Sequence, residues 1–488
     1  MATTPTSDSP RDRLRRRGYD AVVVGSGPNG LAAAVTVARR GRSVLVVEAA
    51  PDFGGGARTA ERTLPGFRHD VCSAIHPLAA ASPFFRTLPL ERHGLEWVHP
   101  DVPLAHPLDG GAAALLERSF DATARSLGED GDAWRALMEP FAARSETLFA
   151  EALGPPRLTR HPLLLARFGL RAARSAEGLA RAWFRGERAR ALFAGIAAHA
   201  ARPLDRPLSA AVGMMLAVAG HAAGWPLPRG GSQRITDALL AHLRELGGEA
   251  VAGWRVGSLG ELPPARAYLF DVAPAHLARI CGAALPARYK AALRRFRHGP
   301  AVFKVDWALA GPIPWAAEEC RRAGTVHLGG TLGEIAAAEA AIWDGWPHGR
   351  PFVLVAQQSL FDPTRAPPGM HTGWAYCHVP RGSALDATAA IEAQVERFAP
   401  GFRDLIRARA VMGPPDFAAY NENFVGGDIG GGVMDLWQAF TRPVARPVPY
   451  TTPNAKIFIC SASTPPGPGV HGMCGHHAAL AALRTVLR

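Results

Sequence analysis

Three glycines near the start of the chain have the spacing of a turn that binds phosphate. Gly25, Gly27 and Gly30 form the pattern G-x-G-x-x-G, between an apolar run at 19–24 and an alanine-rich segment at 31–40. The first glycine permits a tight turn, the second leaves room for a pyrophosphate, and the third lets a helix pack against a strand. The N–H groups that begin the helix then face the phosphates. This spacing predicts a dinucleotide-binding site.

An acidic residue follows at the distance that such a site requires. Glu48 ends the next apolar run, 43–47. A carboxylate in this place accepts hydrogen bonds from ribose hydroxyls and repels a 2′-phosphate. Strand, glycine turn, helix and second strand together predict a Rossmann-type β-α-β unit, and the alternative is a glycine-rich turn that binds nothing.

A second glycine cluster favours FAD over a nicotinamide dinucleotide. Residues 52–59 follow the second predicted strand directly and contain Gly55, Gly56 and Arg58. Glycines there bring the backbone close to a cofactor, and an arginine neutralises a phosphate. We therefore expect this segment to lie along the same cofactor as the first turn.

A third candidate segment lies near the C-terminus. A predicted strand at 455–461 leads through a Gly/Pro-rich loop to Gly469, Gly472 and Met473, where a helix is expected to begin. A helix N-terminus beside the N1/C2=O edge of a flavin favours the reduced, more negative form. Binding segments at both ends of the chain suit a long cofactor.

These segments resemble phytoene desaturase-like flavoproteins, which are relatives of the amine oxidases. Within that superfamily they are most similar to the subgroup of pyridine nucleotide-disulphide oxidoreductase domain-containing protein 2. The stretches that carry the resemblance are 22–48, 54–58, 65–70, 426–429 and 459–478. Carotenoid desaturases usually carry Gly-Gly-Arg after the second strand, and Gly-Gly-Gly-Ala-Arg stands here at 54–58, which argues against direct carotenoid chemistry.

The resemblance implies an α/β fold with a discontinuous domain arrangement. A Rossmann-type FAD-binding domain is expected to be interleaved with an α+β substrate domain. It further implies an adenine contact at Val256 and, because 426–433 contains no cysteine, FAD that is held non-covalently. The expected ranges are a disordered tail at 1–18, the FAD-binding domain at 19–105, 225–299 and 448–488, and the substrate domain at 106–224 and 300–447.

Hydrophobic periodicity completes the expected elements. Apolar residues three and four apart predict mostly helical segments, and short apolar runs predict strands. The helices are expected at 112–149, 163–200, 384–397 and after the N-cap Ser232 as far as Leu246; the strands are expected at 250–256, 267–271, 300–310 and 352–359.

Two residues are candidates for catalysis. His76 lies in a loop that the family folds near the flavin, where an imidazole could act as acid or base, and the alternative is a hydrogen-bonded loop histidine. Lys304 lies on a predicted strand that resembles the amine-oxidase strand whose lysine holds a water at flavin N5. Only three of the 54 basic residues are lysines. A retained lysine can mark a place that arginine does not serve, or it can survive by chance.

Other polar clusters suggest less. His471, Cys474, His476 and His477 lie on the helix that the flavin already uses, so we expect no metal site there. Tyr376 and His378 alternate on a likely strand and share one face, where they either line a cavity or are ordinary sheet residues.

Composition limits the choice of partners. The net charge of +12 over 488 residues comes with no nucleic-acid-binding motif, so we expect no nucleic-acid partner and attribute the arginine excess to GC-rich codons. Six scattered cysteines favour neither disulfides nor zinc and suit the cytoplasm. Nine arginines between 157 and 190 alternate with apolar residues. They form either a solvated helical face or a peripheral membrane contact.

The expected function is an FAD-dependent dehydrogenase, desaturase or oxidase that takes hydride from a C–H bond of an apolar, natural-product-like molecule. The electron acceptor is O₂ or another oxidant, and an oligomer is left open. The alternatives are a flavin amine oxidase, a redox-neutral flavin-dependent isomerase, and a non-enzymatic lipid-binding protein on the same fold.

Overall fold

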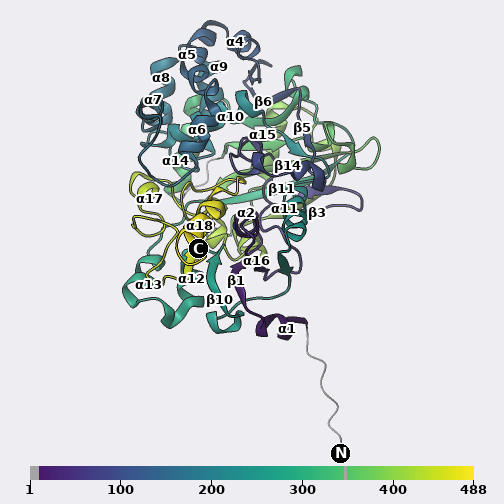
Figure 1. Cartoon of the computed structure of the whole chain (residues 1–488). Helices are drawn as coiled ribbons and strands as arrows, with labels where there is room; N and C mark the ends of the chain where they lie inside the picture. Colours follow the sequence, from purple (N-terminus) through teal and green to yellow (C-terminus); the bar gives the residue numbers. More distant parts are fainter. Residues whose placement is uncertain (1–9, 346–348) are drawn as a thin grey trace, which may run out of the picture.

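Two sheets and a helical layer make up the protein. The computed structural model describes residues 10–345 and 349–488. Figure 1 places a parallel sheet with its helices in the lower half, and a larger sheet with a cluster of helices above it. The chain passes between the halves several times, so each is built from segments far apart in sequence.

The lower half contains a five-stranded parallel sheet in the order β16-β10-β1-β2-β9. Alternate residues of β1 enter two different cores: Ala21 and Val23 pack beside the helices α2, α11 and α18, whereas Val22 and Val24 pack beside α12 and α13. A strand that is buried on both faces needs an apolar run rather than an alternating pattern. The elements are β1 Tyr19–Val24, α2 Pro28–Ala38, β2 Val44–Val47, α11 Gln233–Glu245, β9 Glu249–Val251, β10 Ala265–Phe270, α12 Pro274–Cys281, α13 Ala287–Arg294, β16 Ile457–Ile459 and α18 Met473–Arg484.

The upper half contains a seven-stranded sheet in the order β15-β11-β14-β13-β12-β6-β7. All its pairings are antiparallel except that of β6 with β12. One face, which we call the outer face, packs an apolar core against α15. The opposite, inner face is turned toward the parallel half. The elements are β6 Val102–Pro107, β7 Ala113–Leu116, β11 Ala301–Leu309, β12 Ala323–Leu328, β13 Val353–Ala356, β14 His371–Val379, α15 Thr388–Phe398 and β15 Ile406–Met412.

A layer of helices covers one end of the larger sheet, at the top of Figure 1. Its central helices α9 and α10 pack on each other, and α14 packs on α9. The helices are α4 Phe120–Leu127, α5 Gly131–Ala142, α6 Ser145–Ala152, α7 Pro162–Ala172, α8 Ala176–Trp183, α9 Glu187–Ala198, α10 Ser209–Ala223 and α14 Leu332–Trp343. No helix among the described residues is both long and apolar enough to span a bilayer.

Short elements connect these layers. Two short antiparallel pairings join β3 to β4 and β5 to β8. The short elements are α1 Pro10–Arg16, β3 Thr59–Glu61, β4 Arg68–Asp70, α3 Pro77–Ala80, β5 Trp97–Val98, β8 Leu227–Pro228, α16 Pro414–Tyr420 and α17 Leu436–Thr441.

The predicted α/β class and the parallel Rossmann-like core are confirmed, and four local expectations need correction. Residues 10–16, expected to be disordered, form α1, whose Leu14 packs on the lower core. Residues 113–116, expected to be helical, instead pair with β6 as the buried edge strand β7. Strand β9 ends at Val251, so 252–256 is a loop. Strand β6 crosses the predicted domain boundary between 105 and 106. Residues 1–9 of the predicted tail lie outside the described residues.

Candidate functional site

The first glycine turn is closed by the end of a neighbouring strand. Gly25 has φ +101°, and a Cβ there would lie 2.8 Å from the Asp271 carbonyl oxygen. A Cβ on Gly27 would lie 2.9 Å from Asp271 Oδ2, and one on Gly30 would lie 2.0 Å from the Gly25 carbonyl oxygen. Larger residues therefore do not fit at any of the three positions, which is the geometry that a close approach of pyrophosphate requires.

Asp271 is a residue of this turn that sequence analysis missed. Its Oδ2 accepts the Gly30 N–H at 2.9 Å. Burial raises the pKa of the Asp271 carboxyl to about 7, against the lowering effect of the Gly30 hydrogen bond, and the charge of Glu48 raises it further. Asp271 directly follows an apolar strand, β10, as Glu48 follows β2. That shared position is the signal that could have found it.

Glu48 lies where the sequence predicted it, at the carboxyl end of β2. Its Oε2 accepts hydrogen bonds from the backbone N–H and the hydroxyl of Ser26, at 2.8 and 2.6 Å, and its Oε1 accepts the Ala50 N–H at 2.9 Å. These bonds hold the carboxylate beside the glycine turn, within reach of a ribose.

The second glycine cluster packs directly on the first. A Cβ on Gly55, which has φ +55°, would lie 2.9 Å from Gly27 Cα. The guanidinium of Arg58 lies over the Tyr420 ring, 4.2 Å from its centroid, and its Nε donates to the Gly55 carbonyl oxygen. Tyr420 donates to the same oxygen at 2.9 Å. Arg58 is thereby oriented at the edge of the site by a stacking partner that the sequence did not reveal.

The C-terminal helix begins beside the same site. Gly472, with φ +68°, is the N-cap of α18, and Met473 is its first residue. A Cβ on Gly472 would lie 2.4 Å from the Phe85 ring, and one on Gly475 would lie 1.8 Å from the Asn29 carbonyl oxygen. The starts of α2 and α18 are therefore packed closely together, and both helix N-termini lie at the same part of the candidate site.

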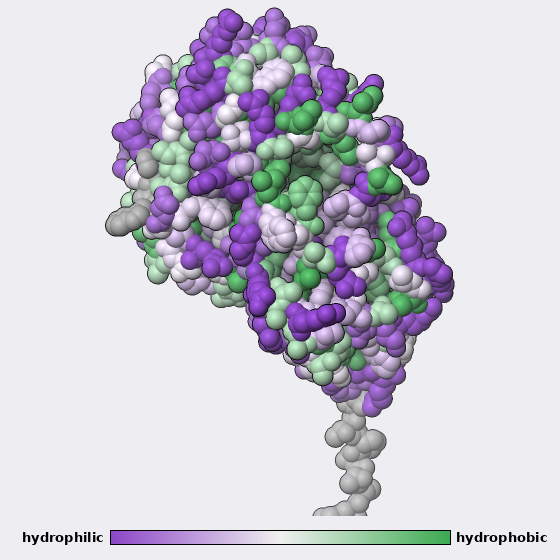
Figure 2. Space-filling view, turned by 90° about the vertical axis from the view of Figure 1, so that its left-hand side faces the viewer, coloured by the Kyte–Doolittle hydropathy of each residue, from purple (hydrophilic) through white to green (hydrophobic). Residues whose placement is uncertain are grey.

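A cavity of about 910 Å³ joins these segments to the upper half of the protein. At one end it is lined by 25–29, Glu48, 55–58 and 469–470, and elsewhere by the inner face of the large sheet and by helices α7 and α10. Gly472 and Met473 are not among its lining residues. Figure 2 shows a hollow in one face of the molecule with hydrophobic residues around it. The cavity is large enough for a dinucleotide segment and a small molecule together.

Val256 and Gly56 also line this cavity. Val256 is buried in the loop after β9, and the same loop is attached to the cofactor side by hydrogen bonds from Gly253 to Ala50 and from Trp254 to Glu48. The predicted adenine contact therefore lies at the cavity, although on a loop rather than on a strand. Its role stays a prediction.

His76 lines the cavity as a buried, neutral residue. Because the Ser232 hydroxyl donates to the Ser73 carbonyl oxygen, His76 Nε2 must donate to Ser232 Oγ, 2.8 Å away. Ser232 precedes α11 as predicted, but its side chain makes no capping bond. Burial lowers the pKa of His76 to about 4. This is the geometry of the hydrogen-bonded loop histidine, and a catalytic role for His76 remains a prediction.

Lys304 lies behind the cavity wall. It is 1% exposed, is not among the lining residues, and pairs with Asp306 Oδ2 at 2.5 Å. Its Nζ lies 5.7 Å from the centroid of the Trp374 ring, which does line the cavity. Burial lowers the pKa of Lys304, and Asp306 opposes that shift. The geometry gives direct action at a flavin no support, so the proposed catalytic role is untested and a positioning role is better supported.

The histidines near the C-terminus do not converge. His471 Nδ1 accepts the Met473 N–H, His476 Nδ1 lies 2.9 Å from the Thr36 hydroxyl, and His477 stacks on Tyr450. Each ring therefore has a separate structural contact.

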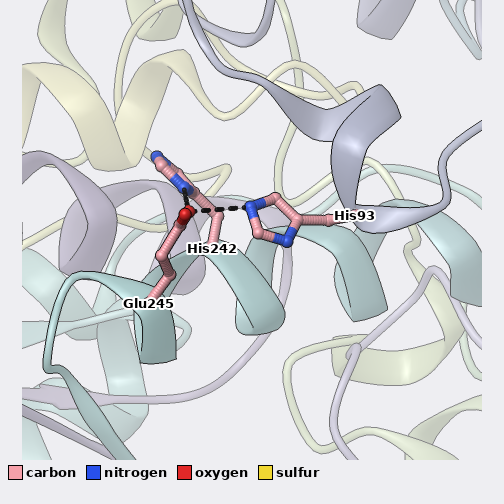
Figure 3. Close-up of side chains that lie close together, drawn as sticks. All are labelled: His93, His242 and Glu245. Carbon is pink, nitrogen blue, oxygen red and sulfur yellow. Dashed lines mark hydrogen bonds and ion pairs between the residues drawn. The ribbon is translucent and has the colours of Figure 1, made fainter.

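A different histidine cluster lies on the surface (Figure 3). Glu245 Oε2 lies 3.0 Å from His93 Nε2 and 3.1 Å from His242 Nδ1, with His242 and Glu245 on α11. The Arg92 guanidinium lies 3.5 Å from the other carboxylate oxygen. The carboxylate is already bound by two rings and a cation, so the cluster is explained as a hydrogen-bond network without an ion.

Comparison with known proteins agrees with this geometry. Residues 23–88 match the NAD(P)-binding Rossmann-like domain family. Pyridine nucleotide-disulfide oxidoreductase domain-containing protein 2 of Mus musculus is 25% identical over 554 aligned positions, which cover 94% of this chain and 92% of the mouse protein. The similarity to that protein extends along nearly the whole length of both chains. A local match, 32% identical over 142 residues, covers 28% of this chain and 26% of a limonene dehydrogenase chain from Castellaniella defragrans.

Solved structures share the whole fold. An oxidoreductase from Methanosarcina mazei has a TM-score of 0.64 at 16% identity, with 96% of this chain and 100% of that chain covered. A putrescine oxidase has a TM-score of 0.61 at 18% identity, with 96% and 99% covered. The predicted fold is therefore confirmed, with a Rossmann-like segment at its dinucleotide-binding end.

Proposed function

We propose that the protein oxidises an apolar small molecule with non-covalently held FAD, as a dehydrogenase, desaturase or oxidase. One observation carries the proposal: a single cavity runs from the glycine turns to an apolar wall formed by residues such as Phe168, Met215 and Leu216. A dinucleotide at one end and an apolar substrate at the other would share one space shielded from water.

The residues fit FAD at three places. The turn of Gly25, Gly27 and Gly30 leaves room for pyrophosphate, Glu48 presents a carboxylate to a ribose, and Arg58 presents a cation at the same edge. FAD, when bound, supplies the acceptor for a hydride from a substrate C–H bond. The chain itself binds the apolar substrate and excludes water.

Purification and flavin release test this proposal. We expect a yellow protein that releases FAD on acid precipitation and whose flavin bleaches when an apolar substrate is added without O₂. Oxygen consumption on turnover would identify O₂ as the electron acceptor, and its absence would favour another oxidant. A product that forms without net reduction would favour the isomerase instead.

Amine oxidation is a second candidate because aromatic rings line the cavity. Trp374 and Tyr376 stand edge to face, with centroids 5.4 Å apart, and aromatic rings attract amines and other cations. Hydrogen peroxide release from primary amines would favour this candidate. The fold alone does not decide for catalysis, because a Rab GDI from Plasmodium falciparum shares it with a TM-score of 0.53 at 9% identity, with 96% of this chain and 97% of that chain covered. A colourless protein that takes up no FAD would favour a binding protein.

A further inference from the structure

The cavity has a polar end within its apolar wall. His378 and Tyr376 lie on the inner face of β14 and line the cavity. His378 Nδ1 lies 2.9 and 3.0 Å from the two carboxylate oxygens of Glu339, which projects from α14. Both partners are buried, with 5% and 2% exposure. An ionisable pair in an apolar site is costly unless it serves structure or binding.

The hydrogen bond to Glu339 determines which ring nitrogen is free. A carboxylate only accepts hydrogen bonds, so Nδ1 of His378 carries the hydrogen and Nε2 is left for another partner. Among the described residues, His378 Nε2 and the hydroxyl of the half-buried Tyr376 make no hydrogen bond and line the cavity. Thr325 Oγ1, also of the cavity wall, is buried without a partner. Because buried polar groups normally find partners, these free polar atoms at one cavity point to a polar ligand.

The neighbouring histidine adds no charge. His199 lines the cavity with its Nε2 3.0 Å from His327 Nε2. Burial lowers the pKa of His199 to about 3. His199 is therefore neutral at pH 7, and the Glu339–His378 pair dominates the polar end.

We propose that His378 and Tyr376 bind a hydroxyl group on an otherwise apolar substrate. A hydroxyl can donate to Nε2 and accept from the Tyr376 hydroxyl at once, whereas a carboxylate has no hydrogen to donate to Nε2, and an ammonium would leave the hydrogen of the Tyr376 hydroxyl unused. Glu339 acts as a positioning residue that holds the ring and its tautomer. This inference deepens the proposed function and rests on its assignment of the cavity to substrate.

Four probes of equal chain length test the hydroxyl site: 1-octanol, octane, octylammonium and octanoate. Binding is followed by tryptophan fluorescence, and bound FAD by its visible spectrum. We expect 1-octanol to bind about tenfold more tightly than octane, the value of one or two good hydrogen bonds. The other two probes should gain less. His378→Phe should reduce the preference to about twofold, and Tyr376→Phe should halve it.

Controls separate this proposal from the one before it. Met215→Leu changes an apolar part of the same wall and should weaken 1-octanol and octane equally. An undiminished preference in both His378→Phe and Tyr376→Phe would overturn the hydroxyl site, as would tighter binding of octylammonium or octanoate. A colourless protein that keeps the preference would instead reject the FAD proposal and retain the hydroxyl site.

An independent observation concerns the surface beside the cavity. Six large apolar side chains are strongly exposed on two segments, and we call them the exposed apolar patch. They are Leu158 (99% exposed), Leu163 (80%), Leu170 (74%), Leu436 (52%), Trp437 (74%) and Phe440 (67%). A small cavity lined by Leu165, Ala439 and Phe440 shows that α7 and α17 are neighbours. Figure 1 places both at the left side, the side that faces the viewer in Figure 2.

Positive charge accompanies the patch. Leu163, Arg167 and Leu170 lie four and three residues apart, so they share one face of α7, while Leu164 and Phe168 are buried on the other. Residues 152–176 contain five arginines and no acidic residue. Arg160 and Arg167 are exposed, and neither has an ion-pair partner among the described residues.

We infer that the exposed apolar patch docks on the surface of an anionic lipid membrane. Exposed leucine and tryptophan insert at the level of the lipid headgroups, and unpaired arginines are attracted to anionic lipids. Phe168 on α7 and Met434 before α17 line the main cavity. Docking there would bring the cavity close to dissolved apolar molecules.

Vesicle flotation tests the lipid inference. We expect the protein to float with phosphatidylcholine vesicles that contain about 30% phosphatidylglycerol, and to bind at least about tenfold less to pure phosphatidylcholine. Trp437→Ser with Leu163→Ser should abolish flotation, and Arg160→Gln with Arg167→Gln should weaken it severalfold. Leu64→Ser, an exposed leucine in the β3–β4 turn, is the matched control and should float normally.

Two outcomes would overturn the lipid inference. The first is equal flotation of wild type and the Trp437→Ser/Leu163→Ser variant. The second is a dimer in light scattering that Trp437→Ser dissociates, since a second copy would then cover the patch. Far-ultraviolet circular dichroism confirms that each variant is folded.

Discussion

The two sheets place their functional groups in different parts of a strand. In the parallel sheet both faces of β1 are apolar, and Gly25, Glu48 and Asp271 all follow strand ends. In the seven-stranded sheet the polar side chains lie on one face, where Lys304 and Asp306 alternate with Phe303 and Val305 of the outer core.

The candidate site at the parallel sheet is therefore shaped mainly by backbone turns, whereas the inner face of the larger sheet is shaped by side chains. Turns at strand ends require glycine at particular positions, and any larger residue there would collide with backbone or with the Asp271 carboxylate. The inner face instead takes its character from every second residue of several strands, which meet only after the strands pair. Substitutions at the strand ends of the parallel sheet should therefore act differently from substitutions on the inner face of the seven-stranded sheet.

The largest expected effect is the loss of FAD binding when a glycine at the strand ends of the parallel sheet is replaced. Gly27→Asp should abolish FAD binding, by more than about a hundredfold, because a Cβ there would already lie 2.9 Å from Asp271 Oδ2 and the added carboxylate would repel a pyrophosphate. The ratio of flavin to protein absorbance measures the loss. Gly260→Asp, at an open position, should bind FAD normally. Retained FAD in Gly27→Asp would remove the turn from the site.

Substitutions on the inner face of the larger sheet should mainly lower the free energy of unfolding. Lys304→Met leaves Asp306 buried beside weaker partners, Arg62 at 3.3 Å and His69 at 3.5 Å, and should lower the free energy of unfolding by about 3–5 kcal/mol. Val305→Ala, the adjacent outer-face residue, should lower it by about 1.5–3 kcal/mol. Denaturant titration measures both. Lys304→Met should also keep FAD and slow flavin reduction; unchanged reduction would leave Lys304 a purely structural role.

Asp271 should make the stability of the FAD-free protein depend on pH. Its pKa is about 7 in the fold and about 3.8 in an unfolded chain. Between these values the folded state holds the extra proton, so stability falls as pH rises from about 4 to about 7, by up to about 1.4 kcal/mol per pH unit. Asp271→Asn should remove this slope, and the exposed Asp404→Asn should not. A wild-type profile that is flat over this range would contradict the buried carboxyl.

The smallest effect is expected from a hydroxyl on the inner face. Tyr376→Phe should change the free energy of unfolding by less than about 0.5 kcal/mol, since no hydrogen bond to this hydroxyl is present among the described residues. Tyr450→Phe removes a buried bond to the Pro465 carbonyl oxygen, 3.0 Å long, and should lower stability by about 1 kcal/mol. Equal losses would mean that Tyr376 is hydrogen-bonded within the protein.

Most of the candidate cofactor site could be predicted from the sequence. The pattern from Gly25 to Glu48 is local, and its geometry follows from a strand, a turn and a helix that are continuous in the chain. Arg58 and Gly55 follow in the same continuous stretch of chain, and their part in binding a cofactor stays a prediction. Asp271 was missed because its partner Gly30 lies 241 residues away, and Val256 was assigned to a strand that ends at Val251.

The inner face shows where sequence reasoning stops. Alternation indicated that Tyr376 and His378 share a face, yet it did not show that Glu339 approaches from a helix 39 residues earlier. Lys304 was correctly placed on a strand, but its pairing with Asp306 and its cover by Trp374 depend on the register of β11 with β14. Register is decided by packing over the whole sheet, which a single strand does not encode.

The sequence by itself determined the apolar strands, the glycine turns and the resemblance that they carry, because these depend on neighbours a few residues apart. Only the tertiary structure decided which side chains face the cavity, that Lys304 is buried behind it, and that α7 and α17 form one exposed apolar patch. The physical reason is that backbone turns are local steric requirements, whereas a cavity wall or a surface patch exists only where distant segments come to lie side by side.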